Sequence, residues 1–204
     1  MPLTLRRTKG SQLTWDEVDA NWTAGRTFDG TILLGGEATA FDDLLMPLVQ
    51  GKQGQVDKPA FDATNLGYLF PQNDATQILY LNCQIPHRWK VGSTIYPHVH
   101  WDQAANQVPV FKIDYRWYSI GAERPAGWAT YAMDTLAVPY TSGTIHQISK
   151  GAAGIDGTGK GISSMLIMKL YRDDNVYTGN VLATSMDVHI EIDSFGSETE
   201  YSKT

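Results

Sequence analysis

The sequence lacks the features that mark several large classes of protein. It contains a single cysteine, Cys83, in 204 residues, so no disulfide can form within the chain. It has no run of about 18 consecutive apolar residues, as a membrane-spanning helix requires. No apolar stretch follows the first basic residues to serve as a signal peptide. We therefore expect folding in a reducing cytoplasm and no membrane partner.

Charge is also scarce. Charged residues make up 19% of the chain, below the roughly 25% that is usual for soluble proteins. The 16 basic and 22 acidic residues give a net charge of −6, and the basic residues cluster only at Arg6, Arg7 and Lys9. Binding to a phosphate backbone depends on clustered cations, so nucleic acid is not an expected partner. The hydrophobic content of 42% is sufficient for the core of one domain.

One short helix is predicted near the N-terminus. Thr14 and Glu17 have the spacing of a capping box, and Trp15, Val18 and Trp22 lie on one helical stripe. A helix of two or three turns is marginal alone in water, so the tryptophan stripe must dock on the body of the protein or on a partner. We interpret residues 1–25 as an anchoring segment.

The remainder of the chain divides into an arm and a body. Residues 26–65 contain short apolar runs broken by glycines, and we interpret them as an extended arm or linker. Residues 66–204 follow a period of two, most clearly at 186–193, where apolar and polar residues alternate. Six to eight such strands without helices between them predict a mainly β fold, an antiparallel jelly-roll-like sandwich.

We find no complete catalytic motif in the sequence. Residues 154–161 resemble a phosphate-binding loop, but Gly161 replaces the Ser or Thr that would bind magnesium, and a strand pattern follows in place of a helix. Cys83 shares a strand face with apolar residues, which indicates a small buried side chain and not a reactive thiol. No serine occupies a G-x-S-x-G elbow. We expect no catalytic residues and no enzyme activity.

The pair His98 and His100 is the best candidate for a metal site. Alternate residues of a strand share a face, so the two imidazoles lie about 6–7 Å apart and could bind one divalent ion together. With Gly92 the pair resembles the first half of a cupin motif, but alanines replace its glutamate and the second motif is missing. A cupin-like metal enzyme is therefore an alternative. Four polar residues of the last strand could add ligands, although solvation alone explains them: Asp187, His189, Glu191 and Asp193.

Two further interpretations depend on partners. Three chains meeting beside this strand could offer six imidazoles on a threefold axis, an octahedral structural site for a transition metal that would hold a homotrimer together. Apart from that ion we expect no cofactor. The ten tyrosines and six tryptophans mostly suit core and cross-strand pairs, but exposed members such as Trp128 could bind a host-surface glycan.

The opening of the chain resembles a short module at the N-termini of tail-fibre and related structural proteins of tailed bacteriophages. Residues 13–22 read LTWDEVDANW, which is similar to its recurring pattern L-T-x-x-E-V-D-A-N-[FW]. The body is similar to a group of mostly uncharacterised phage virion proteins. The segments that carry this second resemblance are 58–62, 69–74, 95–101, 159–164, 170–173 and 189–197.

The two resemblances imply a structural component of a virion, assembled in the cytoplasm of the bacterial host. A tail fibre or tail-attached protein, forming a homo-oligomer and most simply a trimer, is the preferred interpretation, and a capsid decoration protein is the alternative. The expected partners are other phage virion proteins. The module's position implies that it attaches the protein to the particle through residues within 13–22, namely Leu13, Trp15, Val18, Asn21 and Trp22.

Overall fold

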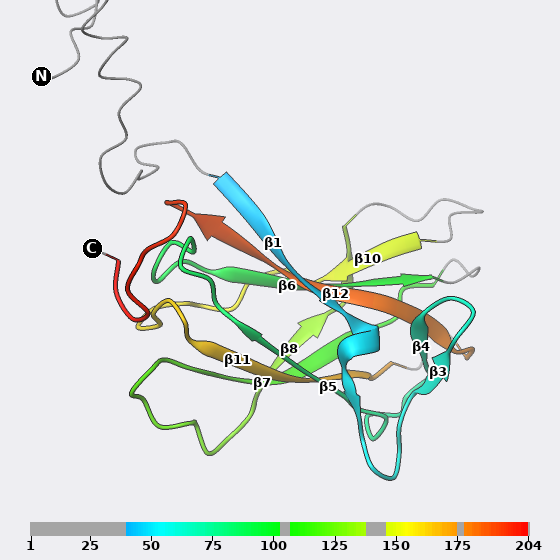
Figure 1. The fold of residues 1–204 in the computed structure, drawn as a ribbon. Coiled ribbons are helices and arrows are strands. Elements are labelled where there is room, and N and C mark those ends of the chain that lie inside the picture. Colours follow the sequence, from blue (N-terminus) through cyan, green and yellow to red (C-terminus); the bar gives the residue numbers. More distant parts are fainter. Residues whose placement is uncertain (1–39, 103–106, 138–145, 175–177, 204) are drawn as a thin grey trace, which may run out of the picture. The chain divides into compact units, whose positions relative to one another are not determined.

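The fold consists of β-strands in two antiparallel sheets (Figure 1). The computed structural model describes residues 40–102, 107–137, 146–174 and 178–203. The predicted N-terminal helix and its anchoring residues lie outside the described residues. Within them, no helix is long and apolar enough to cross a membrane. The prediction of a mainly β sandwich is confirmed.

The larger sheet has seven strands, in the order β3-β4-β12-β6-β10-β9, with β1 paired to β12 beside β4. Its long central strand β12 pairs with β6 on one side and with β4 and β1 on the other. The bounds are β1 (Ala40–Pro47), β3 (Ala60–Asp62), β4 (Gly67–Phe70), β6 (Ile95–Asp102), β9 (Thr135–Leu136), β10 (His146–Lys150) and β12 (Val181–Ile192).

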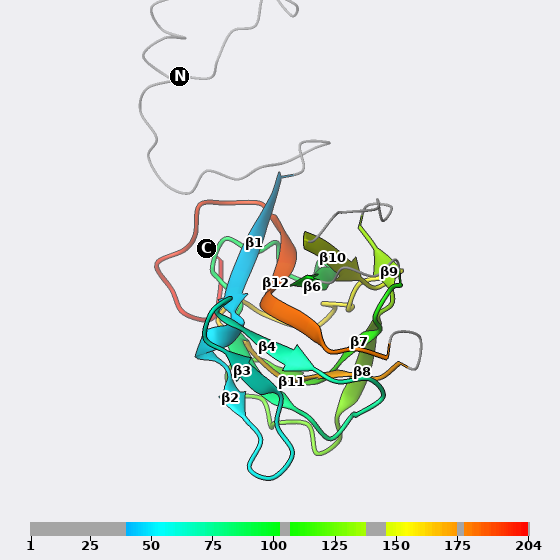
Figure 2. The same ribbon diagram turned by 90° about the vertical axis from the view of Figure 1, so that its right-hand side faces the viewer.

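The smaller sheet has five strands, in the order β2-β5-β11-β7-β8, and faces the larger one (Figure 2). A single turn of 3-10 helix, η1 (Leu48–Gln50), leads from β1 of the larger sheet into β2 of the smaller. The strand bounds are β2 (Lys52–Gln53), β5 (Leu79–Gln84), β7 (Phe111–Tyr118), β8 (Ala129–Met133) and β11 (Met165–Arg172).

The core lies between the sheets and is built from alternate residues of their strands. On β6, Val99 and Trp101 are completely buried while their neighbours face outward. Trp101 also donates a hydrogen bond from Nε1 to Oγ of Ser149 at 2.9 Å, so its one polar group is satisfied in the core. Burial of the odd-numbered residues of β6 therefore turns its even-numbered residues to the outer face of the seven-stranded sheet.

The predicted boundary between arm and body at residue 66 is wrong. The whole of β1 pairs with β12, from Ala40 opposite Ile192 to Pro47 opposite Ser185, and β2 and β3 also join the sheets. β2 and β3 are only two and three residues long, and β1 lacks a clear alternation of polar and apolar residues, so no local pattern marked these strands. β1 and β2 are completed by partners that are distant in the sequence. Residues 26–39 of the predicted arm lie outside the described residues.

Candidate metal centre

Two histidines and an aspartate, side chains of the kinds that can bind metal ions, lie together on the outer face of the seven-stranded sheet. His98 and His100 share that face, as their spacing predicted, and their ring centroids are 5.5 Å apart. On the neighbouring strand β12, Asp187 is directly opposite His98 in the register of the sheet. The pairing of β6 with β12 thus brings a carboxylate to the two imidazoles within one chain.

The three side chains converge on a small volume. His98 Nε2 is 2.6 Å from Asp187 Oδ1, and His100 Nε2 is 3.3 Å from Asp187 Oδ2. One potential ligand atom from each residue lies within 4.8 Å of the other two. The Asp187 side chain is 8% exposed, and the two imidazoles are 15% and 19% exposed. The carboxylate is therefore buried beneath two partly accessible rings.

Neighbouring acceptors orient both rings. His98 Nδ1 is 3.2 Å from the carbonyl oxygen of Tyr96, and His100 Nδ1 is 2.9 Å from Nε2 of His146, whose ring stacks on that of His100. Because a carbonyl can only accept, His98 carries a hydrogen on Nδ1. The same tautomer of His100 would donate to His146. In this arrangement each ring turns its Nε2 toward Asp187.

The electrostatics of the group depend on the contacts to Asp187. Burial alone would raise the pKa of Asp187, but its contacts with His100 and His98 outweigh this effect and lower the pKa to about 2. Burial alone would lower the pKa of His98, but the contact with Asp187 and its negative charge raise it. The carboxylate is therefore ionised at neutral pH although it is buried, and it favours a cation at this place.

Of the four polar residues proposed on the last strand, only Asp187 reaches the pair. The ring of His189 is 6.3 Å from that of His98 and packs against Phe41. Glu191 accepts a hydrogen bond from Lys90 at 2.6 Å, and Asp193 is paired with Lys203. Contact with solvent is sufficient to explain the polar side chains of His189, Glu191 and Asp193. It does not explain Asp187, which is buried.

His146 was missed by the sequence analysis, and no local signal marks it. It begins β10 and lies opposite Asp102 in the register, two residues along β6 from the outward-facing His100 that its ring covers. The threefold site predicted for His98 and His100 remains untested. The structure differs from it in one respect: within a single chain, the pair already has a carboxylate partner.

A serine and a histidine that the sequence analysis did not single out also lie together. Ser163 Oγ is 2.8 Å from His87 Nε2, and His87 Nδ1 is 2.8 Å from the carbonyl oxygen of Ser197. Ser163 is 5% exposed and does not line either of the two pockets described for the molecule. Through His87, these hydrogen bonds connect Ser197 to the turn before β11. A structural role is therefore sufficient to explain why Ser163 and His87 lie together.

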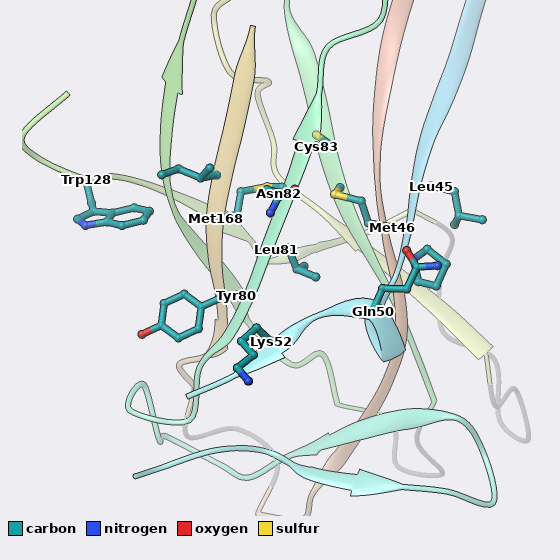
Figure 3. Close-up of a pocket in the computed structure, with 12 residues that line it drawn as sticks. Leu45, Met46, Gln50, Lys52, Tyr80, Leu81, Asn82, Cys83, Trp128 and Met168 are labelled. Atoms are coloured by element: carbon teal, nitrogen blue, oxygen red, sulfur yellow. The ribbon is translucent and has the colours of Figure 1, made fainter. Parts of the chain in front are cut away.

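The predicted glycan site falls on a pocket of about 510 Å³ lined by β1, β5 and β11 (Figure 3). Trp128 and Tyr80 both line it, together with polar Asn82. Arg116 Cζ and Lys169 Nζ lie 4.4 and 4.1 Å from the centre of the Trp128 ring. Two aromatic rings thus line the pocket, and two cationic side chains lie against one of them.

Cys83 and Lys160, which the sequence analysis considered for catalysis, both lie in surroundings that suit a structural role. Cys83 lines the same pocket, and burial raises the pKa of its thiol to about 12, as expected for an unreactive side chain. Lys160, from the segment that resembles a phosphate-binding loop, donates a hydrogen bond to the carbonyl of Trp117 at 3.0 Å. Neither residue is arranged for catalysis in the manner its motif would require.

Comparison with known proteins adds little to this description. No family model matches the chain, and no curated protein is significantly similar to it. Among solved structures, the CBM22-1 and GH10 modules of endo-1,4-β-D-xylanase 10B from Clostridium thermocellum, complexed with xylohexaose, match at 10% identity and a TM-score of 0.34. The match covers 87% of this chain and 30% of that chain. A similarity of this strength carries no argument about fold or function.

Proposed function

We propose that this chain is a structural component of a tailed-phage virion, a tail fibre or tail-attached protein that oligomerises, most simply as a trimer, and docks through its N-terminus. The observation that carries the proposal is the resemblance of residues 13–22 to the attachment module, joined to a β-sandwich body. The body supplies a stable fold and many surfaces for contact with neighbouring subunits, which is what a virion component needs.

The edge strand β1 supports an assembly role. It pairs with β12 on one side, and no other described strand pairs with its second side. Phe41 and Leu45 are 50% and 63% exposed on this strand. Apolar side chains on an unpaired edge favour association with another protein surface. A neighbouring virion subunit is the partner that the proposal assigns to this edge.

The test is incorporation into particles. Trp22→Ala should leave the melting temperature of the purified protein nearly unchanged and abolish its incorporation, because the tryptophan stripe serves attachment. Tyr201→Ala, at an exposed position remote from residues 13–22 in sequence, is the control and should be incorporated normally. A fall in melting temperature of about 8 °C or more with normal incorporation would show that Trp22 belongs to a folded core.

Electron microscopy of the particles separates the two structural alternatives. A tail-attached protein should be located on the tail and present in few copies, whereas a decoration protein should cover the capsid in many copies. Labelling found on the capsid alone would replace the tail assignment with the decoration role. Absence of the protein from purified particles would refute the virion proposal as a whole.

A second candidate function, recognition of a host-surface glycan, is favoured by the pocket of Figure 3. Tyr80 is 41% exposed and, with Trp128, provides aromatic faces of the kind that stack on sugar rings. Lys169 and Arg116 beside Trp128 would favour an acidic saccharide. Binding to host polysaccharide should be lost in Tyr80→Ala and in Trp128→Ala and kept in Tyr201→Ala; equal binding by all three variants would eliminate this function.

A further inference from the structure

We propose that His98, His100 and Asp187 of a single chain bind one divalent transition-metal ion of the Zn²⁺ class, and that His146 positions His100 for this role. The site lies on the outer face of the seven-stranded sheet and is complete within one chain. It therefore differs from a site shared by three chains on a symmetry axis. The inference does not depend on a virion function, because it is carried by the geometry of the described residues.

The hydrogen bonding around Asp187 favours a bound ion. Its side chain is more than nine-tenths buried, yet Oδ1 has no hydrogen-bond partner among the described residues, although His98 Nε2 is only 2.6 Å away. The nitrogen is thus close enough for an ion pair, but the direction of approach does not suit an N–H···O bond. A buried carboxylate oxygen left without a partner is costly. An ion beside both atoms would satisfy it.

The tautomers of the two histidines also favour a bound ion. The Tyr96 carbonyl fixes the hydrogen of neutral His98 on Nδ1, so the lone pair of Nε2 faces the carboxylate. A lone pair and a carboxylate at this separation repel each other until Nε2 takes up a proton or a metal ion. The metal ion would lie beside the two atoms, because 2.6 Å is too short for an ion between them. His146 provides the same kind of support for His100, 2.9 Å from its Nδ1. Acceptors behind ligating imidazoles are characteristic of metal sites in proteins.

The separations suit a small ion. Zn²⁺ binds imidazole nitrogen and carboxylate oxygen at about 2.0–2.2 Å, which places ligand atoms of a tetrahedral site about 3.4 Å apart. The ligand atoms here are separated by distances from 2.6 Å to at most 4.8 Å, which bracket that value. Small rotations of the side chains would close the site. Two nitrogens and one oxygen leave a fourth position open on the solvent side.

The charges around the site are mixed. Asp43 contributes negative charge that acts on His98, while Lys150 is the exposed cross-strand neighbour of His98 on β10. The charges of Asp43 and Lys150 therefore nearly cancel at this place, and the charge of Asp187 provides the net attraction for a cation. Neither of the two pockets described for the molecule is lined by these residues. The ion would accordingly join β6 to β12 and leave one coordination position for water or a neighbouring chain.

The test uses the full-length chain, stripped with a chelator and titrated with Zn²⁺ against a chromophoric competitor. The expected result is one ion per chain, bound in the micromolar range or tighter. A saturating ion should also raise the melting temperature by about 5 °C or more, because it binds only the folded state. One ion per three chains, or no binding of Zn²⁺ in the micromolar range, would overturn the proposal.

Variants separate ligands from bystanders. Asp187→Asn keeps the size of the side chain and should weaken Zn²⁺ binding at least 100-fold, as should His98→Gln. His189→Ala removes a histidine of the same face that is not a ligand here, and should change affinity less than threefold. Melting in the absence of metal confirms that each variant folds. If Asp187→Asn bound Zn²⁺ as tightly as the unmodified protein, Asp187 would not be a ligand and the assignment would be refuted.

The positioning role of His146 has its own test. His146→Ala should weaken Zn²⁺ binding about 10-fold, within the range usual for groups that hold a metal ligand from behind. His146→Gln keeps an acceptor for the Nδ1 hydrogen of His100 and should recover most of the loss. If alanine and glutamine had the same effect, His146 would have no positioning role.

Discussion

Two buried carboxylates in this body have very different surroundings. Asp174 accepts two bonds from the Arg172 guanidinium, at 2.6 and 2.9 Å, and one from the backbone N–H of Val110 at 3.0 Å. Asp187 instead faces two imidazoles, and one of its oxygens has no hydrogen-bond partner within the part of the chain that the structure describes. Both side chains are more than nine-tenths buried. The first carboxylate is saturated, and the second is not.

The saturated group joins elements of both sheets. Arg172, at the end of β11, is completely buried and also donates hydrogen bonds to the carbonyls of Phe70 on β4 and Gly179. An arginine cannot lose its charge inside a protein, so its partners are needed for the fold. Histidines can release a proton and become neutral. The comparison therefore separates a carboxylate that stabilises structure from one that is available to a ligand.

The largest expected effect is that of Asp174→Ala. It leaves the Arg172 charge buried without its bidentate partner, which should destabilise the body by about 3–5 kcal/mol. Denaturant unfolding followed by tryptophan fluorescence would measure it. A loss below about 1 kcal/mol would show that solvent reaches the guanidinium and that the pair is not structurally important.

A smaller effect is expected at a neutral buried pair. Ser149→Ala removes the acceptor of the Trp101 indole N–H, which should cost about 1–3 kcal/mol because a buried donor is left unpaired. Ser194→Ala is the matched control, since the Ser194 hydroxyl is also buried but has no hydrogen-bond partner among the described residues. Its removal should change stability by less than about 0.5 kcal/mol. Equal losses in the two variants would contradict this distinction.

Asp187→Ala should have a still smaller effect than Ser149→Ala on the metal-free protein. An imidazole, unlike the Arg172 guanidinium, does not carry a permanent charge, so removing the carboxylate leaves no fixed charge buried, and the free energy of unfolding should change by less than about 1 kcal/mol. The same denaturant experiment, run beside Asp174→Ala, gives the comparison directly. A loss as large as that of Asp174→Ala would mean that Asp187 is a structural carboxylate.

The last prediction concerns reactivity and involves no change of stability. Burial raises the pKa of Cys83 to about 12, whereas contacts with His100 and His98 hold the pKa of the buried Asp187 at about 2. Because only the thiolate reacts, alkylation of Cys83 at pH 8 should be at least about 100-fold slower in the folded protein than in denaturant. Rapid alkylation of the folded protein would show that a neighbouring group stabilises the thiolate.

Local patterns were sufficient to predict part of this molecule. Alternation of apolar and polar residues predicted the strands and placed His98 and His100 on one face, because the side-chain period of a strand is a property of the backbone itself. The interpretation of residues 40–62 as an arm failed because β1 does not alternate cleanly between polar and apolar residues and because β2 and β3 are too short to show a pattern. β1 is a strand because β12 lies beside it.

The candidate metal centre likewise has one part that the sequence predicts and another that only the fold determines. That two imidazoles share a face follows from their spacing along the chain. That Asp187 lies opposite His98, that His146 covers His100 and that His189 stays apart all depend on the register of β6 with β12 and β10. Register arises from the packing of the whole core, since a shift by one residue would turn every one of these side chains to the other face. Only the folded sheet could therefore select which of the polar residues meet.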